Sequence, residues 1–154
     1  MISKKLKEYL DSQQVKYVTV THSVAYTSQE VAAYAHISGH ELAKTVMVQL
    51  DGRMAMAVVP ASLRVDLEAL KALSGATAAR LAHEPDFKEL FPDCETGAMP
   101  PFGNLYGLPV YVADRLAEDE QIAFNAGTHN ELIKLAYKDF ERLVQPKVGR
   151  LTAR

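Results

Sequence analysis

The stretch "TVMVQLDGRMAMAVVPA", residues 45–61, gives the clearest indication of the fold in this chain of 154 residues. Two apolar runs flank the dipeptide Asp51-Gly52, which suits the two-residue turn of a type I′ β-hairpin. The pattern predicts strands over residues 45–50 and 53–59. We take this hairpin as the starting point of the predicted sheet.

Shorter patterns on both sides of the hairpin predict a mixture of helices and strands. Helices are expected over residues 3–13, from Thr27 to about His36, over 67–73, within "EPDFKELF" (84–91) and around 140–144. Strands are expected near 15–20 and 77–81, within "LPVYVAD" (108–114) and "QIAFNAG" (121–127), and where Ile133, Leu135 and Tyr137 alternate. Helix ends are marked by the capping-box pair Thr27 and Glu30, by Asp66 before the helix at 67–73, and by Gly75 after it. About seven strands and five short helices, without regular βαβ alternation, indicate one α+β domain over residues 1–154 with a mixed, curved sheet.

The composition limits the classes of function. Lys and Arg total 17 against 19 Asp and Glu, which leaves a net charge of −2. General nucleic-acid binders are usually basic, so we expect no DNA binding and only a local contact with RNA. A single cysteine excludes an intramolecular disulfide and fits a cytoplasmic location. No signal peptide and no membrane-spanning run is visible, so no membrane partner is expected.

Several enzyme signatures are missing from the chain. It has no phosphate-binding loop, no G-x-S-x-G elbow and no HExxH motif. Cys94 has no histidine partner in the sequence pattern and is interpreted as an ordinary thiol. His36 and His40 have helical spacing, but Ser38 and Gly39 between them weaken a helix. We therefore expect neither a metal nor a cofactor.

Four features remain as candidates for a site, and each has a plainer alternative. Lys44 precedes an apolar strand, where a lysine often extends to solvent. His129 in the turn of "NAGTHNEL" (125–132) is placed to present an imidazole at a strand end, although a lone histidine is more often structural. His22 in "THSVAYTSQE" either borders the same cavity or only marks a strand exit before a helix cap.

The fourth feature is the loop "GAMPPFG", residues 97–103, in which Phe102 looks exposed. Its two prolines disfavour both helix and strand, so it is either a rigid edge connection or a preshaped rim. Gly97 and Gly103 allow the backbone to approach a ligand and to direct N–H groups into a cavity. The prolines limit the entropy that the loop loses when a ligand binds.

Taken in order, "ELAKTVMV" (41–48), "GAMPPFG" and "FNAGTHNELIKLAYKDFERLV" (124–144) form a recognisable series. Over residues 15–146 the chain resembles the YbaK/prolyl-tRNA-synthetase editing-domain family of aminoacyl-tRNA deacylases. The resemblance implies a mixed, barrel-like central sheet surrounded by short helices. It also implies a free-standing trans-editing enzyme that hydrolyses the ester of mischarged tRNA, without metal or cofactor, by substrate-assisted attack of water.

The same resemblance assigns the site residue by residue. Lys44 matches the family's lysine that holds the terminal adenosine, and Gly127 and His129 match its Gly-x-His turn. With the residue patterns described above, the expected catalytic residues are Lys44, Gly97, Gly127 and His129. The expected substrate-binding residues are His22, Ala98, Met99, Pro100, Pro101, Phe102, Gly103 and Thr128. The expected partners are the acceptor end of tRNA, with tRNA for proline first, and a prolyl-tRNA synthetase.

The amino acid to be removed is left open by the sequence. Alanine on tRNA for proline is the first expectation, and serine, threonine and cysteine are the alternatives. Two other classes of function also remain: a non-catalytic module of the same fold that binds tRNA or a synthetase, and a small-molecule pocket protein.

Overall fold

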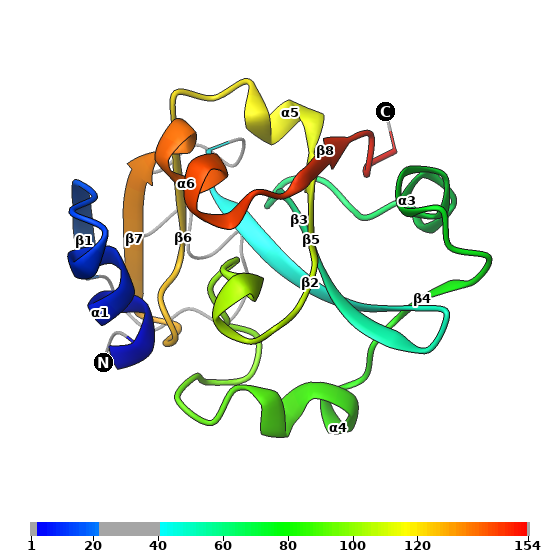
Figure 1. The fold of residues 1–154 in the computed structure, drawn as a ribbon, viewed down its shortest axis with the longest axis horizontal. Coiled ribbons are helices and arrows are strands. Elements are labelled where there is room, and N and C mark those ends of the chain that lie inside the picture. Colours follow the sequence, from blue (N-terminus) through cyan, green and yellow to red (C-terminus); the bar gives the residue numbers. More distant parts are fainter. Residues whose placement is uncertain (1–2, 22–40, 154) are drawn as a thin grey trace.

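The computed structural model describes residues 3–21 and 41–153 (Figure 1). Its α-helices are α1 (Lys4–Ser12), α3 (Leu67–Ser74), α4 (Glu84–Phe87), α5 (Asp114–Ala117) and α6 (Tyr137–Val144), with two 3-10 helices, η1 (Lys88–Leu90) and η2 (Gly103–Leu105). Its strands are β1 (Tyr17–Thr21), β2 (Ala43–Leu50), β3 (Arg53–Pro60), β4 (Ala79–Leu81), β5 (Val110–Ala113), β6 (Gln121–Asn125), β7 (Glu131–Ala136) and β8 (Lys147–Gly149). The predicted α+β class is confirmed.

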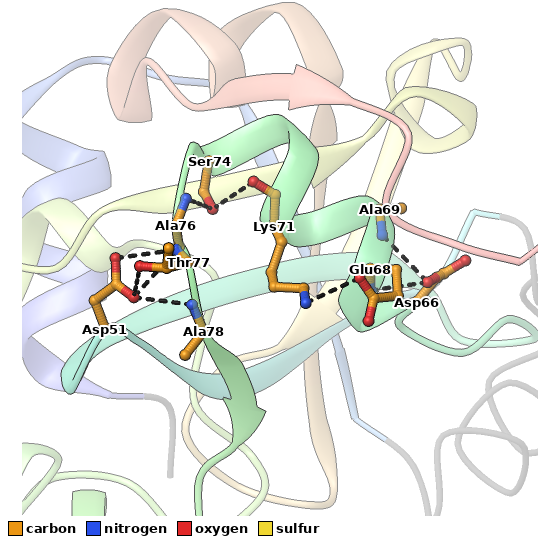
Figure 2. Close-up of polar contacts among 9 residues, drawn as sticks. All are labelled: Asp51, Asp66, Glu68, Ala69, Lys71, Ser74, Ala76, Thr77 and Ala78. Carbon is orange, nitrogen blue, oxygen red and sulfur yellow. Dashed lines mark hydrogen bonds and ion pairs between the residues drawn. The ribbon is translucent and has the colours of Figure 1, made fainter.

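The hairpin β2–β3 forms as its sequence predicts. Leu50 pairs with Arg53, and Asp51 and Gly52 between them have φ angles of 51° and 83°. Both angles are positive, as a type I′ turn requires. The Asp51 carboxylate also accepts hydrogen bonds from the amides of Thr77 and Ala78, at 3.1 and 2.9 Å (Figure 2). These bonds lower the pKa of Asp51 and fix the hairpin turn to the segment that enters β4.

Helix α3 also begins and ends where the sequence predicts. The Asp66 side chain accepts from the amides of Glu68 and Ala69, and Gly75 ends the helix in the left-handed conformation with φ 80°. Lys71 forms an ion pair with Glu68 one turn away, at 2.9 Å (Figure 2). The helix packs Leu70 against the apolar face of β2 and β3, so local capping and burial act together.

The strands form two sheets. One has the order β1-β7-β6 and the other β4-β2-β3-β5-β8. Within the described part of the chain the two sheets meet through a single parallel bridge, between Leu42 and Ala123. The expectation of a barrel-like sheet is therefore wrong, because a barrel needs a continuous ladder of hydrogen bonds around its circumference.

The main core lies between the two sheets. Side chains from α1, β2, β3, β5, β6, β7 and α6 meet in its largest apolar cluster, whose most buried members include Leu6, Leu10, Met56, Phe102, Phe124 and Phe140. A second cluster lies beneath α3 on the other face of β2 and β3. A third, which we call the bridge cluster, consists of Leu42, Ala61, Ala123 and Leu132.

Three elements were not foreseen, namely α5, η2 and β8. Strand β8 is only three residues long and pairs in parallel with β5, so no local pattern marks it. The predicted helix from Thr27 to His36 and the candidate residues His22 and His40 lie outside the described residues. Among the helices that the structure describes, none combines the length and apolar character needed to span a membrane.

Candidate active site

The loop at residues 97–103 lies directly against the Gly-x-His turn. The amide of Glu95 donates to the carbonyl of Gly127 at 2.7 Å, and the amide of Gly127 donates to the carbonyl of Ala98 at 2.9 Å. The amide of His129 donates to the Glu95 carboxylate at 2.7 Å, and the Nε2–H of its ring donates to the carbonyl of Thr96 at 2.8 Å. Four hydrogen bonds therefore join the turn to residues 95–98, one of them to Ala98 within the loop and three to Glu95 and Thr96 just before it.

Glycine is required at both junctions. Gly97 and Gly127 have φ angles of 86° and 103°, a region that residues with a Cβ atom rarely adopt. A Cβ atom at position 97 would lie 3.5 Å from Cε1 of His129, and one at position 127 would lie 3.0 Å from Cβ of Ser3. The backbone geometry therefore favours glycine at both positions, and at Gly127 the close contact with Ser3 adds to that preference.

The second half of the loop is buried. Met99, Pro100 and Pro101 are buried, and the side chain of Phe102 is fully inaccessible. The Phe102 ring packs against Phe140 and Phe124, each with a centroid distance of 5.5 Å. The expectation of an exposed Phe102 is wrong, because the ring anchors the loop in the main core.

Gly103 has a packing role rather than a conformational one. A Cβ atom there would lie 2.6 Å from the carbonyl oxygen of Leu108 and 2.6 Å from Cγ2 of Val110. Only glycine fits this contact without movement of the backbone. Together with the prolines and Phe102, Gly103 keeps the exposed end of the loop at Gly97 in a fixed position.

The amides of the loop differ in what they contact. The N–H of Ala98 donates to the carbonyl of Glu95 at 3.0 Å and is therefore committed within the loop. The N–H of Gly97 contacts the thioether of Met99 at 3.2 Å, and a thioether is a weak acceptor. Because Gly97 is also exposed, its N–H is the better candidate donor to a ligand.

Lys44 lies on β2 opposite Val59, in a row of otherwise apolar side chains that includes Leu42 and Val46. Its side chain is half-buried. Burial lowers the pKa of Lys44, and the positive charge of Arg64 lowers it further. A partly desolvated ammonium group beside a second cation is well suited to bind an anion.

The strands bring Lys44 toward the same end of the molecule as the turn. The bridge between Leu42 and Ala123 is parallel, so β2 and β6 run in the same direction from it. Lys44 lies two residues beyond Leu42, and Asn125 lies two residues beyond Ala123, just before Gly127. The hydrogen bonds that join the loop to the turn do not include Lys44, whose position follows from the strand register.

Thr128 fills the middle of the turn. Its hydroxyl contacts Oδ1 of Asn130 at 2.9 Å and the Glu131 carboxylate at 3.3 Å. The side chain is thus occupied within the turn. Substrate binding by Thr128 stays a prediction, and in this structure its hydroxyl stabilises the turn.

Ser3 holds the turn from the other side, a contact that was not predicted from the sequence. The amide of Ser3 donates to the carbonyl of Ala126 at 2.7 Å, and its hydroxyl donates to the Asp93 carboxylate. The hydroxyl of Ser3 also caps helix α1 by accepting from the amide of Leu6. A serine just before a predicted helix is typical of an N-cap, but no local pattern indicates its contact with the turn.

Cys94 lies close to this contact. Burial raises the pKa of Cys94 to about 11, and its Sγ lies 3.7 Å from the hydroxyl of Tyr106. The thiol is therefore protonated at neutral pH and is a poor nucleophile. This agrees with its interpretation from the sequence as an ordinary thiol.

Comparison with known proteins decides the family. The sequence profile of the aminoacyl-tRNA editing domain matches residues 22–143, which include the Lys44 strand, the 97–103 loop and the Gly-x-His turn. The chain belongs to this family. The resemblance inferred from the sequence is confirmed, as is the predicted aminoacyl-tRNA deacylase class.

A relative in Escherichia coli (strain K12) is the "Multifunctional Ser/Thr-tRNA deacylase ProXp-y". It is 28% identical over 145 residues, which cover 90% of this chain and 86% of the relative. This editing-domain protein thus matches nearly the whole length of its relative.

Solved structures agree on the fold. A crystal structure provisionally described as a trans-editing enzyme for prolyl-tRNA synthetase has a TM-score of 0.83 at 21% identity, covering 99% of this chain and 97% of that one. A crystal structure of a hypothetical protein has a TM-score of 0.87 at 20% identity, covering 97% of this chain and 100% of that one. At these identities the likeness concerns the fold alone.

Proposed function

We propose that the chain is a trans-editing deacylase that hydrolyses the ester of tRNA carrying a wrong, small amino acid. The observation that supports this best is the direct hydrogen bonding of residues 95–98, at the start of the loop, to the turn at Gly127 and His129. The loop and the turn form one unit, which we call the cradle, and the strand that carries Lys44 is bridged in parallel to β6, the strand that leads into the turn.

In this proposal the enzyme works by alignment. An aminoacyl ester is already activated, and the free hydroxyl of the terminal ribose positions or deprotonates the attacking water. The N–H of Gly97 donates to the oxyanion, and one such donor contributes about 3 kcal/mol to transition-state stabilisation. Lys44 supplies positive charge to a phosphate or a ribose hydroxyl.

His129 has a supporting role in this scheme. Its Nε2–H is bonded to the carbonyl of Thr96, and its amide is bonded to Glu95. The ring therefore holds the start of the loop in the position from which the Gly97 N–H is proposed to donate to the oxyanion. We propose that His129 lines and sizes the pocket rather than acting as a general base.

The amino acid is proposed from the rigidity of the cradle. A hydrophobic pocket discriminates against one extra methylene group by only about 1–3 kcal/mol of binding free energy. An editing site that accepts only small amino acids therefore depends on rigid pocket walls. Alanine on tRNA for proline remains our first substrate. The name of the E. coli relative supports serine and threonine as further substrates, and cysteine completes the set.

Contact with tRNA is proposed to be confined to the acceptor end. The net charge of −2 does not favour a broad RNA-binding surface. A prolyl-tRNA synthetase as partner and a cytoplasmic location are parts of the same proposal.

The test is a deacylation panel. Alanine, serine, threonine, cysteine and proline are each attached to tRNA for proline, and the best of them is then attached to other tRNAs. We expect rapid release of at least one small amino acid and slow release of proline. Saturable tRNA binding without hydrolysis of any ester would favour a binding module instead, and binding of free amino acids or nucleotides without tRNA would favour a small-molecule pocket.

A further inference from the structure

Asn125 carries a buried polar atom that the proposed mechanism does not use. Within the part of the chain that the structure describes, its Oδ1 is inaccessible to solvent and has no hydrogen-bond partner. A buried acceptor left unpaired costs about 1–3 kcal/mol, and native proteins keep few of them. The neighbouring polar side chains differ, because Thr128 and Glu95 both have partners.

The position of Asn125 relates it to Lys44. Asn125 pairs with Leu132 across β6 and β7 and lies on the same face as Ala123, so it adjoins the bridge cluster. Lys44 adjoins the same cluster from β2, two residues beyond Leu42. The buried bridge cluster is thus bordered by a cation on one strand and by a neutral amide on another.

We propose that the Asn125 side-chain amide binds the α-ammonium group of the aminoacyl ester. This inference rests on the proposed function, because every aminoacyl-tRNA carries that ammonium one carbon away from the carbonyl to be attacked. The ammonium enters a site that already contains the positive charge of Lys44. It therefore needs an acceptor, and the apolar bridge cluster offers none.

A neutral acceptor suits this place better than a carboxylate. A carboxylate at position 125 would also attract the Lys44 ammonium and compete with the anionic part of the substrate. The carbonyl of an amide accepts from the α-ammonium without neutralising Lys44. Asn125 thus makes the site selective for aminoacyl esters with a free amino group.

The experiment compares esters with free and blocked amino groups. Alanyl-tRNA and seryl-tRNA for proline are each prepared with a free amine and with an N-acetyl group. Every enzymatic rate is divided by the spontaneous hydrolysis rate of the same ester, because acetylation itself stabilises the ester. The proteins are the wild type, Asn125→Ala, Asn125→Asp and the control Gln121→Ala, an exposed position on the same strand.

We expect the wild type and Gln121→Ala to prefer the free amine. Asn125→Ala should lower kcat/KM on the free-amine esters about 10- to 100-fold, the effect of losing a hydrogen bond to a charged group. Its rate on the N-acetyl esters should not change, so this variant should lose the preference for the free amine. Asn125→Asp should keep the preference, because a carboxylate also accepts from an ammonium.

Two outcomes overturn the inference while leaving the proposed function intact. One is an unchanged preference in Asn125→Ala; the other is an equal fall on free and blocked esters with an unchanged unfolding temperature, which would indicate a general effect on the site. A third outcome is distinguishable from these two. If the wild type hydrolyses none of the free-amine esters, both the proposed function and the inference that rests on it are overturned.

Discussion

Gly97 lies beside His129, so that a Cβ atom at position 97 would be in van der Waals contact with Cε1 of the imidazole, at 3.5 Å. The contact joins the loop whose amide is proposed to bind the oxyanion to the turn proposed to line the pocket. Because the imidazole is also bonded to the carbonyl of Thr96, any displacement of the ring moves the loop with it. A substitution at Gly97 is therefore expected to disturb the geometry of both the loop and the turn.

The first prediction concerns this contact. Gly97→Ala should lower kcat/KM for deacylation at least tenfold, since one misdirected oxyanion donor costs about 10²–10³ in rate. Gly52→Ala is a matched control, because Gly52 has nearly the same φ, 83° against 86°, and nothing near its would-be Cβ atom. Both variants should lose similar stability in thermal unfolding. Equal loss of activity in both would show that backbone strain alone is responsible.

The second prediction concerns the charge of Lys44. Lys44→Ala should abolish amino-acid release with the fold intact, as judged by circular dichroism and thermal unfolding. The half-buried ammonium group is costly without its ligand, so its removal should not destabilise the protein. Turnover equal to that of the wild type would remove Lys44 from the site.

The third prediction follows from the lowered pKa of Lys44. The ammonium form is lost as the pH rises through this pKa, so enzymatic deacylation should decline at a pH below the usual lysine value of about 10.4. Arg64→Ala removes a like charge and should move the decline to higher pH. The measurement is a pH profile of kcat/KM with the spontaneous hydrolysis subtracted. Arg53→Ala, an exposed arginine at the far end of the hairpin, should leave the profile unchanged.

The same shift has a consequence for stability. In the interval between the lowered pKa and about 10.4, the unfolded chain binds more protons at Lys44 than the folded one. The contribution of Lys44 to the free energy of unfolding therefore increases with pH across that interval. Lys44→Met should reduce this slope in urea titrations, and an identical slope would contradict the lowered pKa.

The fourth prediction separates the anchor of the loop from its chemistry. Phe102→Ala should destabilise the protein by about 3–5 kcal/mol in urea unfolding, because it removes a fully buried ring from the core. Phe102→Leu, which fills more of the space, should lose less stability and retain most deacylation. A large loss of activity in a stable Phe102→Leu variant would instead indicate that the ring contacts the substrate.

The fifth prediction tests the link between loop and turn. Glu95→Ala removes the acceptor of the His129 amide and should lower both activity and the unfolding temperature, the latter by roughly 2–4 °C. Glu95→Gln keeps an oxygen that accepts from the same amide and should restore most of both. Glu89→Ala, an exposed glutamate on η1, serves as the control. If Glu95→Gln were as impaired as Glu95→Ala, the negative charge rather than the hydrogen bond would be the relevant property.

Local signals in the sequence were sufficient for much of the fold. The turn at Asp51-Gly52 and the helix between Asp66 and Gly75 depend on φ angles and caps that neighbouring residues decide. The same local character explains why β8 was missed, since a three-residue strand is stabilised by pairing with β5 and not by its own pattern. The order of the motifs around Lys44, Gly97 and His129 was enough to indicate the family.

Sequence by itself thus determined the hairpin, the caps, the family and the identity of the motif residues. Only the tertiary structure decided that Glu95 bonds to His129, 34 positions away, that Phe102 is buried, and that Asn125 and Lys44 adjoin one apolar cluster. It also decided that the sheets meet at one bridge instead of closing into a barrel. The physical reason is that turns and caps depend on interactions between neighbours in the chain, whereas burial and long-range hydrogen bonds depend on how the two sheets pack against each other.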